Sequence, residues 1–372
     1  MKFLVPPVLF VLIAFTSTAL AESSKDATVD ELLKKLPPPE KLVKDPVQRA
    51  ARQEDPALKD RLGGDVINAA ERGNFAGAIK LGGHLIERYP QSAASHCLYG
   101  AVLMVDRKFP TAQSEFQRAI QLRGDFSLAY FLLGITQAVQ KQFTAALPNV
   151  KKVTSLEPNE PLAWMLVSEC QSGLGHKQEA VQAAQRATVV SPAYLPAWLE
   201  LARAENEAGN MNECLHAVLR GADLSPDSAY MLATVGYSYI NLNRIPEAIP
   251  PLQRAAHFSP NDFLVRAQLG FCLETVGQTN AAMDHLRTAA KLNPNYAPVW
   301  EHLGLAYIQQ GRHREAVNCF ERATQIMPSY QQAWQHLAQE YQAIGRPADA
   351  QKAAARASQL RNTAPKNSKK HA

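Results

Sequence analysis

The sequence predicts an all-α protein made of tandem helix-turn-helix units, because the same residues return every 34 positions. The first recurring feature is a proline, found at Pro158, Pro192, Pro226, Pro260, Pro294 and Pro328, with Gly124 and Pro90 completing the series toward the N-terminus. The second is an alanine twelve residues before these positions, with Cys214 as the one exception, and the third is tryptophan, which recurs at the fourth residue of four units as Trp164, Trp198, Trp300 and Trp334. A fixed period of this length indicates stacked helical repeats rather than one globular core.

Nine units follow when this proline is taken as position 32. They start at Lys59, Ala93, Ser127, Pro161, Leu195, Ala229, Phe263, Ala297 and Gln331. Position 20 is Ala in eight of the nine units, with Cys214 as the exception, and position 8 is a small residue in eight. Small residues at these two positions predict two helices in close contact.

Each unit carries the apolar stripes of two amphipathic helices. Positions 4, 7, 8 and 11 share one face of a helix, and positions 20, 24 and 27 share a face of a second helix. Position 15, between them, is Gly in six units and Asn243 in another, as expected for the left-handed residue that ends a helix. The proline at position 32 then ends the second helix.

The pattern resembles the tetratricopeptide repeat. The stretch from Ala297 to Pro328 matches the signature of that family residue by residue: Trp300, Leu303-Gly304, Tyr307, Ala316, Phe320, Ala323 and Pro328. The resemblance covers about Lys59 to Asn362. It implies a solenoid that forms a right-handed superhelix, with a concave face lined by the first helices, and it implies protein or peptide binding as the activity.

The chain divides into four parts by composition. Residues 1–21 have an apolar run that ends in Ala19-Leu20-Ala21, which predicts a signal peptide cleaved before Glu22. Residues 22–58 form a proline-containing linker with one helix candidate, which either tethers the array or docks on it. Residues 59–362 are the nine repeats, whose first and last units are atypical and predict caps. Residues 363–372 form a basic tail that we expect to be disordered.

The signal peptide predicts export, and we expect the mature protein to be soluble. A bacterial periplasm is the favoured location, since the sequence carries no Asn-x-Ser/Thr acceptor site for glycosylation and no retention signal at its C-terminus. An uncleaved signal that anchors the protein is the alternative. Association with a membrane through a partner is compatible with both.

The charge distribution argues against nucleic acid as a ligand. The formal net charge is +5, but Lys2 lies in the signal peptide, and Arg361, Lys366, Lys369 and Lys370 lie at the C-terminal end. The rest of the chain is neutral, with 34 Lys and Arg against 34 Asp and Glu. A neutral array lacks the basic face that nucleic-acid binding needs.

No residue pattern predicts catalysis, a cofactor or a small-molecule substrate. The sequence has no glycine-rich phosphate loop, no GxSxG elbow and no HExxH helix, and its five Cys show no metal-type spacing. They are expected to be buried structural thiols. His302 and His336 share position 6 of consecutive repeats, beside Glu301. A metal pair is conceivable there, but stacking through repeat periodicity alone is the favoured interpretation.

A binding face is predicted on the first helices. If positions 4, 7, 8 and 11 are buried, then positions 2, 5, 9 and 12 form the neighbouring stripe, which the family resemblance places on the concave face. The residues expected to contact a peptide are Phe131, Ile135, Leu162, Met165, Leu199, Arg203, Asn206, Tyr230, Tyr237 and Phe271. For Ile135, packing against neighbouring helices is the competing interpretation. For Arg203, a salt bridge with Glu169 in the preceding repeat competes with capture of a ligand carboxylate.

The sequence therefore predicts an exported, non-catalytic scaffold that binds a protein or peptide partner along a concave face. Two alternatives remain: a structural protein that self-associates, and an accessory subunit of a cell-envelope or secretion complex docked through its termini. The sequence does not specify the oligomeric state. At position 4 of the seventh unit, Arg266 replaces the expected large apolar residue, and its stem is expected to cover the core while its guanidinium reaches water.

Overall fold

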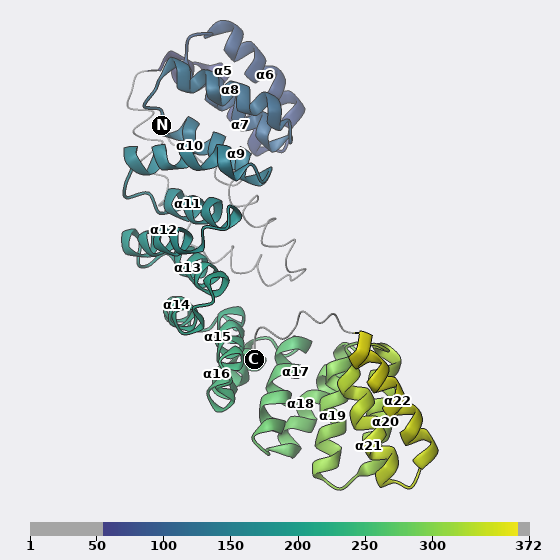
Figure 1. The fold of residues 1–372 in the computed structure, drawn as a ribbon. Helices are drawn as coiled ribbons and strands as arrows, with labels where there is room; N and C mark the ends of the chain where they lie inside the picture. The colour runs from purple at the N-terminus through teal and green to yellow at the C-terminus, as the bar shows by residue number, and fades with distance from the viewer. Residues whose placement is uncertain (1–54, 364–372) are drawn as a thin grey trace. The chain divides into compact units, whose positions relative to one another are not determined.

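A computed structural model describes residues 55–363, so the predicted signal peptide, nearly all of the linker and the tail lie outside the described residues. The described chain is helical, with α-helices connected by short turns and no strand (Figure 1). This confirms the predicted all-α class built from helix-turn-helix units. The chain falls into two compact units that divide after Leu224, and each is described by itself.

The described part of the first unit, residues 55–224, contains eleven helices. They are α4 (Pro56–Lys59), α5 (Arg61–Glu71), α6 (Phe75–Arg88), α7 (Ala93–Val105), α8 (Phe109–Leu122), α9 (Ser127–Val139), α10 (Phe143–Leu156), α11 (Pro161–Gly173), α12 (Lys177–Val190), α13 (Leu195–Ala208) and α14 (Met211–Leu224). After α4, an odd-numbered helix packs against the even-numbered helix that follows it. The odd-numbered helices α7, α9, α11 and α13 also contact one another in succession.

The described part of the second unit, residues 225–363, contains eight helices. They are α15 (Ala229–Asn241), α16 (Ile245–Phe258), α17 (Phe263–Thr275), α18 (Thr279–Leu292), α19 (Ala297–Gln309), α20 (His313–Ile326), α21 (Gln331–Ala343) and α22 (Pro347–Thr363). The pairing continues here, and α17 lies against α19. No helix between residues 55 and 363 is long and apolar enough to cross a membrane.

Close packing within a pair depends on the small residue at position 8. A Cβ added to Gly304 of α19 would lie 2.6 Å from the ring of Phe320 on α20, and one added to Gly100 would lie 2.8 Å from the ring of Phe116. The small residue at position 8 therefore packs mainly against the large side chain at position 24. The sequence pattern had suggested the residue at position 20 as its partner. The alanine at position 20 is nevertheless fully buried, as at Ala316.

The turn within each pair uses a left-handed residue at position 15. Glycine takes this conformation in six units, as at Gly209, where φ is 88°. The other three units place Arg107, Lys141 and Asn243 there, with φ of 58°, 58° and 57°. A side chain with a Cβ pays a steric cost in this region, so the turn geometry of the repeat overrides the local preference of Arg and Lys.

The carbonyl of every repeat-ending proline accepts a hydrogen bond from a side chain. The indole nitrogens of Trp164, Trp198, Trp300 and Trp334, all at position 4, donate to the carbonyls of Pro158, Pro192, Pro294 and Pro328 at 2.8–3.0 Å. A carbonyl after the last turn of a helix has no partner within that helix. The tryptophan therefore joins one repeat to the end of the preceding repeat.

Three units without this tryptophan keep the same bond by other donors. Arg266 Nε donates to the carbonyl of Pro260 at 3.1 Å, and His96 Nε2 lies 3.0 Å from that of Pro90. In the sixth unit position 4 is leucine, and Arg254 of α16 donates to Pro226 instead, at 2.7 Å. Arg266 thus replaces a tryptophan by supplying an N–H to this carbonyl, a contact that the sequence did not indicate.

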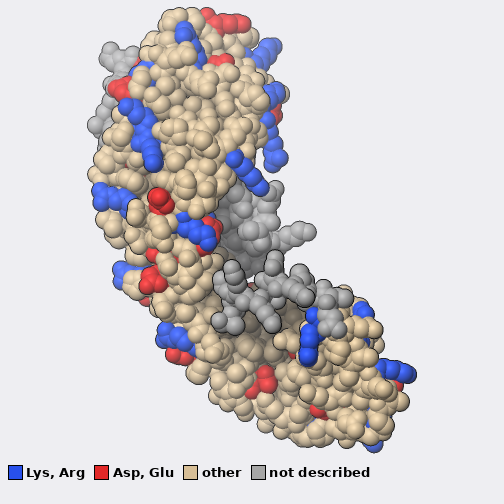
Figure 2. Space-filling view, viewed as in Figure 1, with Lys and Arg blue, Asp and Glu red and all other residues tan. Residues whose placement is uncertain are grey.

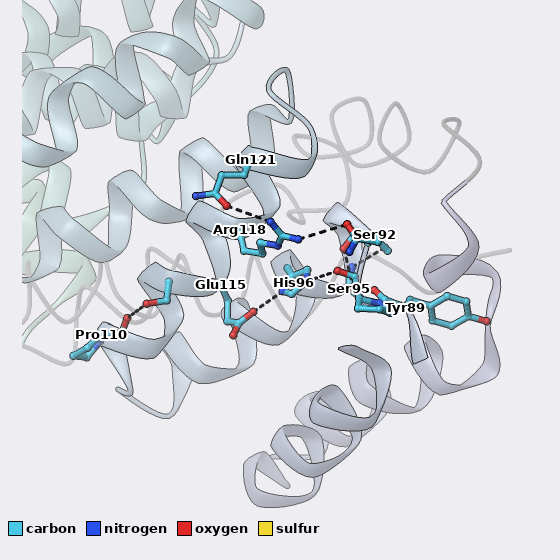
Figure 3. Close-up of polar contacts among 11 residues, drawn as sticks. Tyr89, Ser92, Ser95, His96, Pro110, Glu115, Arg118 and Gln121 are labelled. Carbon is cyan, nitrogen blue, oxygen red and sulfur yellow. Dashed lines mark hydrogen bonds and ion pairs between the residues drawn. The ribbon is translucent and has the colours of Figure 1, made fainter. Parts of the chain in front are cut away.

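His96 also connects the two helices of its pair. Its Nδ1 lies 2.6 Å from Glu115 Oε2 on α8, and the side chain is buried (Figure 3). Both ring nitrogens therefore lie within hydrogen-bond distance of an oxygen. Next to it, Ser95 Oγ donates to the carbonyls of Tyr89 and Ser92 at 2.8 Å.

The short helix α4 lies in the segment assigned to the linker, but it packs on the first unit. Asp55 caps it by accepting from the Ala57 amide at 3.0 Å. The same carboxylate accepts from Ser92 Oγ at 2.6 Å, which ties the start of the described chain to α7. The last residues of the predicted linker are therefore docked on the array.

Candidate functional site

The residues predicted to contact a peptide lie in two separate sets. Phe131 on α9, Leu162 and Met165 on α11, and Leu199, Arg203 and Asn206 on α13 belong to the first unit; we call this set the α9–α13 face. Tyr230 and Tyr237 on α15 and Phe271 on α17 belong to the second unit, as the α15–α17 face. Each set is treated separately, since the two units are described by themselves.

The apolar residues of the α9–α13 face are partly exposed. Phe131, Leu162, Met165 and Leu199 are each half-buried, so part of each side chain remains accessible. Ile135 differs, since it is only 5% exposed and lies inside the core cluster of α7 to α11. For Ile135, the packing interpretation is therefore correct and the predicted peptide contact is wrong.

Arg203 is engaged by carboxylates of its own helix. Its Nη2 lies 2.5 Å from Glu200 Oε1, and its Nη1 lies 2.5 Å from Glu207 Oε1. The predicted salt bridge with Glu169 is not formed. Glu200 and Glu207 lie three and four residues from Arg203 on α13, a spacing that makes them its neighbours on the helix surface, and both pair with its guanidinium. Capture of a ligand carboxylate by Arg203 is also disfavoured, since both of its terminal nitrogens are in use.

Glu169 stays without a cation of its own. Burial, together with the nearby carboxylate of Glu200, raises its pKa above the ordinary range, and the charge of Arg203 only partly offsets this. Neither a hydrogen bond nor an ion pair to Glu169 is found among the described residues. Ser172, one turn further along α11, donates to Glu207 Oε2 at 2.7 Å and so links α11 to α13. The α9–α13 face thus has more carboxylates than its one arginine neutralises.

In the second unit, Phe271 of the α15–α17 face lines a small pocket between α17 and α19. The pocket has a volume of about 140 Å³, and its walls include Ala267, Phe271, Leu286, Tyr296, Val299 and His302. A cavity of about this size with apolar walls admits a benzene-sized group. Tyr230 and Tyr237 are half-buried on α15, and Tyr237 packs against the core cluster of this unit.

Histidine–glutamate pairs join the repeats of the second unit, a feature that sequence reasoning missed. His302 Nδ1 lies 3.5 Å from Glu274 on α17, and His336 Nδ1 lies 3.3 Å from Glu301 on α19. The sequence had suggested that the two histidines stack on each other, but each pairs with a glutamate of the preceding repeat. Glu274 is at position 12 of its repeat and Glu301 is at position 5, so the two pairs do not follow a common sequence pattern.

On balance, the pKa of Glu301 is lowered. Burial alone would raise it, but contacts with His336 and Tyr330 and the nearby charge of His302 have the larger combined effect. Tyr330 donates a hydrogen bond to Glu301, and Glu340 pairs with His313 at 2.8 Å. Among residues 55–363 no group of three or more His, Cys, Asp or Glu side chains could hold a metal ion. The pairs link helices of adjoining repeats.

The cysteines of the described chain are free thiols. Cys97, Cys170, Cys272 and Cys319 are buried, and burial raises the pKa of each thiol to about 12. A thiol with a raised pKa is a poor nucleophile, because the thiolate is the reactive form.

In Figure 2, Lys, Arg, Asp and Glu are scattered over the visible face, without a large block of either sign.

Comparison with known proteins identifies the repeat. A family model described as tetratricopeptide repeat matches residues 112–293, and a second model with the same description matches residues 297–330. No curated protein matches the chain. The fold is similar to solved structures of low sequence identity, and these likenesses concern the fold alone.

Three of these structures cover different shares of the chain. MamA from Desulfovibrio magneticus RS-1 is 18% identical, with 46% of this chain and 96% of that chain covered and a TM-score of 0.43. YrrB, titled a TPR protein with an unusual peptide-binding site, is 17% identical over 50% of this chain and 95% of its own, with a TM-score of 0.45. The APC/C hetero-tetramer Cut9–Hcn1 is 14% identical over 80% of each chain, with a TM-score of 0.44. The repeat pattern, the paired helices and the two family matches together establish that the chain is a tetratricopeptide repeat protein, a member of a family of protein-interaction scaffolds.

Proposed function

We propose that the protein is an exported, non-catalytic scaffold that holds a protein or peptide partner against its first helices. The observation that carries this proposal is the pocket between α17 and α19, which is lined by Phe271, a residue of the predicted stripe. An apolar side chain of a partner would fill it and displace water from its walls, which is favourable in proportion to the apolar area covered.

Two half-buried aromatic residues of the same unit support the same use. Tyr230 and Tyr237 come from α15, whose neighbour α16 packs against α17 in the same unit. Aromatic side chains contribute large contact area at low conformational cost, and they are enriched where proteins bind one another. A partner segment with an apolar anchor residue is therefore the expected ligand class.

The pocket can be tested by filling it. Ala267 is buried in its wall, so Ala267→Leu should occupy the space that a partner's side chain would use. The matched control is Ala281→Leu, which adds the same side chain at an exposed position of α18. A library of displayed peptides is panned against the protein and both variants, each checked by circular dichroism.

We expect peptides with an apolar anchor to be enriched by the protein and by the Ala281→Leu variant, and to be lost with Ala267→Leu. Equal recovery by both variants would move the binding site away from the pocket. If no peptide were enriched at all, self-association or docking through the termini would become the better account. Export is tested separately, because cleavage of the signal peptide should yield a mature chain that begins at Glu22.

A further inference from the structure

We propose that the α9–α13 face binds a segment in which a Lys or Arg side chain stands beside apolar residues. This inference rests on the proposed function, and it adds the chemistry of the partner for the first unit. The face is apolar at one end and acidic at the other, so it specifies both parts of such a segment.

The apolar part consists of Phe131, Met165 and Leu199, which occupy the same repeat position on α9, α11 and α13. All three are half-buried, and the three helices lie side by side. Their accessible surfaces therefore form neighbouring apolar contacts along one face. An apolar side chain of a partner would bury this surface together with its own.

The acidic part lies one helical turn further along. Glu169 follows Met165 by four residues on α11, and Arg203 follows Leu199 by four residues on α13. Residues at this spacing are neighbours on a helix surface. A partner whose apolar side chain contacts Met165 and Leu199 would thus present its next residues to Glu169 and to the carboxylates around Arg203.

The charges in this part do not balance. Glu169, Glu200 and Glu207 supply three carboxylates against the single guanidinium of Arg203, and Glu200 and Glu207 already hold that guanidinium at 2.5 Å. No other basic residue pairs with them between residues 55 and 363. An incoming cation would compensate the excess negative charge, whereas an acidic ligand would meet repulsion.

The position of Glu169 makes this compensation effective. Its carboxylate is largely buried, and burial without a partner raises its pKa. An ion pair with such a group is screened less than a pair on the open surface. The neighbouring Glu207 is more accessible, with its side chain 40% exposed, so a long Lys or Arg side chain can approach from solvent.

The test compares two labelled peptides by fluorescence anisotropy. Both contain leucine and alanine around one central residue, which is arginine in the first and its neutral isostere citrulline in the second. We expect the arginine peptide to bind the purified protein about tenfold more tightly, as one charge-assisted contact predicts. Raising the salt concentration should reduce this preference.

Three variants locate the effect. Glu169→Gln and Glu207→Gln should each remove most of the preference for arginine and leave binding of the citrulline peptide unchanged. Glu213→Gln is the matched control, since it makes the same change at an exposed position of α14 and should keep the preference. Because the pKa of Glu169 is raised, mild acidification should also weaken binding of the arginine peptide, and Glu169→Gln should remove that pH dependence.

Equal binding of the two peptides would overturn the inference and leave the proposed function intact. An unchanged preference in the Glu169→Gln and Glu207→Gln variants would also overturn it, since the cation would then bind elsewhere. If neither peptide bound, this inference would fail, and the proposed function would be decided by the pocket-filling experiment.

Discussion

The two units of this repeat protein differ in the partners of several glutamates, although the most buried glutamate of the first unit, Glu205, accepts hydrogen bonds from Asn210 and Gln185. In the first unit, Glu160 and Glu169 lack a cationic partner, and burial raises the pKa of Glu160 to about 7. In the described part of the second unit, three glutamates are buried, and each lies next to a histidine of an adjoining repeat. These are Glu274 with His302, Glu301 with His336 and Glu340 with His313.

This difference shows that one repeat pattern supports two uses of the same residue type. A buried glutamate that lies next to a histidine of an adjoining repeat links the two repeats, and Tyr330 and Gln309 donate hydrogen bonds to Glu301 and Glu274. A buried glutamate without a cation costs stability, and it is tolerated at a surface that gains a partner. We therefore connect the paired glutamates of the second unit with structure, and of Glu160 and Glu169 we propose a binding role for Glu169 alone, since Glu160 caps α11 by accepting from the Leu162 amide.

The largest expected effects concern the cores, where the two units should behave alike. Phe116 of the first unit and Phe320 of the second occupy the same repeat position, and both are fully buried. Changing either to alanine should cost about 3–5 kcal/mol by leaving a cavity. Hydrogen exchange read by mass spectrometry should show the loss of protection in the unit that carries the substitution. Costs below about 1 kcal/mol would contradict the packing described for position 8 against position 24.

The pH response should separate the units. Because the pKa of Glu301 is lowered in the folded state, its contribution to stability is present above the unfolded pKa of about 4.5 and is lost as the pH falls through the folded value. The pKa of Glu160 is raised, so its contribution is present at low pH and is lost as the pH rises through about 7.

Replacing each glutamate by glutamine tests the direction of these two effects on stability. At pH 8, Glu160→Gln should stabilise the first unit by removing a buried charge, and Glu301→Gln should destabilise the second by about 1–3 kcal/mol, since its partners lose a charged acceptor. Chemical denaturation at pH 5 and pH 8, followed by hydrogen exchange, measures both. The same sign for both variants at pH 8 would abolish the distinction between the units.

A smaller effect concerns the bond between consecutive repeats. Arg266→Met removes the donor to the carbonyl of Pro260 and should cost about 0.5–1.5 kcal/mol. Arg266→Trp restores an indole N–H at a position where four other repeats carry it, and it should recover most of the loss. If methionine and tryptophan gave the same thermal melt, the carbonyl would not need this donor.

The smallest expected effect is a gain in the first unit. Lys141 adopts a left-handed conformation with φ of 58° at the turn where most repeats have glycine. Lys141→Gly should stabilise by about 0.5–1 kcal/mol, since glycine takes this conformation without a steric cost. Asn243→Gly in the second unit is the comparison, and it should gain less, because asparagine tolerates the left-handed region better than lysine does. An equal or larger gain for Asn243→Gly in thermal denaturation would contradict this.

The fold was predictable from the sequence because the same residue preferences recur at the same positions in most repeats. The small residues, the tryptophans and the turn glycines each recur at a fixed position, so an exception such as Arg266 does not obscure the pattern. The first helices from α7 onward begin at the first residue of the corresponding repeat.

The site was less predictable, because contacts between repeats depend on side-chain reach and not on period. Sequence position placed Arg203 and Glu169 at equivalent points of adjacent helices, yet Arg203 pairs with Glu200 and Glu207 of its own helix. Ile135 shares a repeat position with Phe271, yet one is in the core and the other lines a pocket. Local differences in side-chain size decide such outcomes.

The most direct test of the central claim, that the first helices are the binding surface, is methyl NMR of the protein with labelled methionine methyl groups. Met165 reports on the α9–α13 face, and the buried Met283 of α18 reports on the core. Addition of the arginine peptide should shift the Met165 resonance and leave that of Met283 in place. A bound peptide that left Met165 unchanged would contradict the account, because the partner would then occupy a different surface.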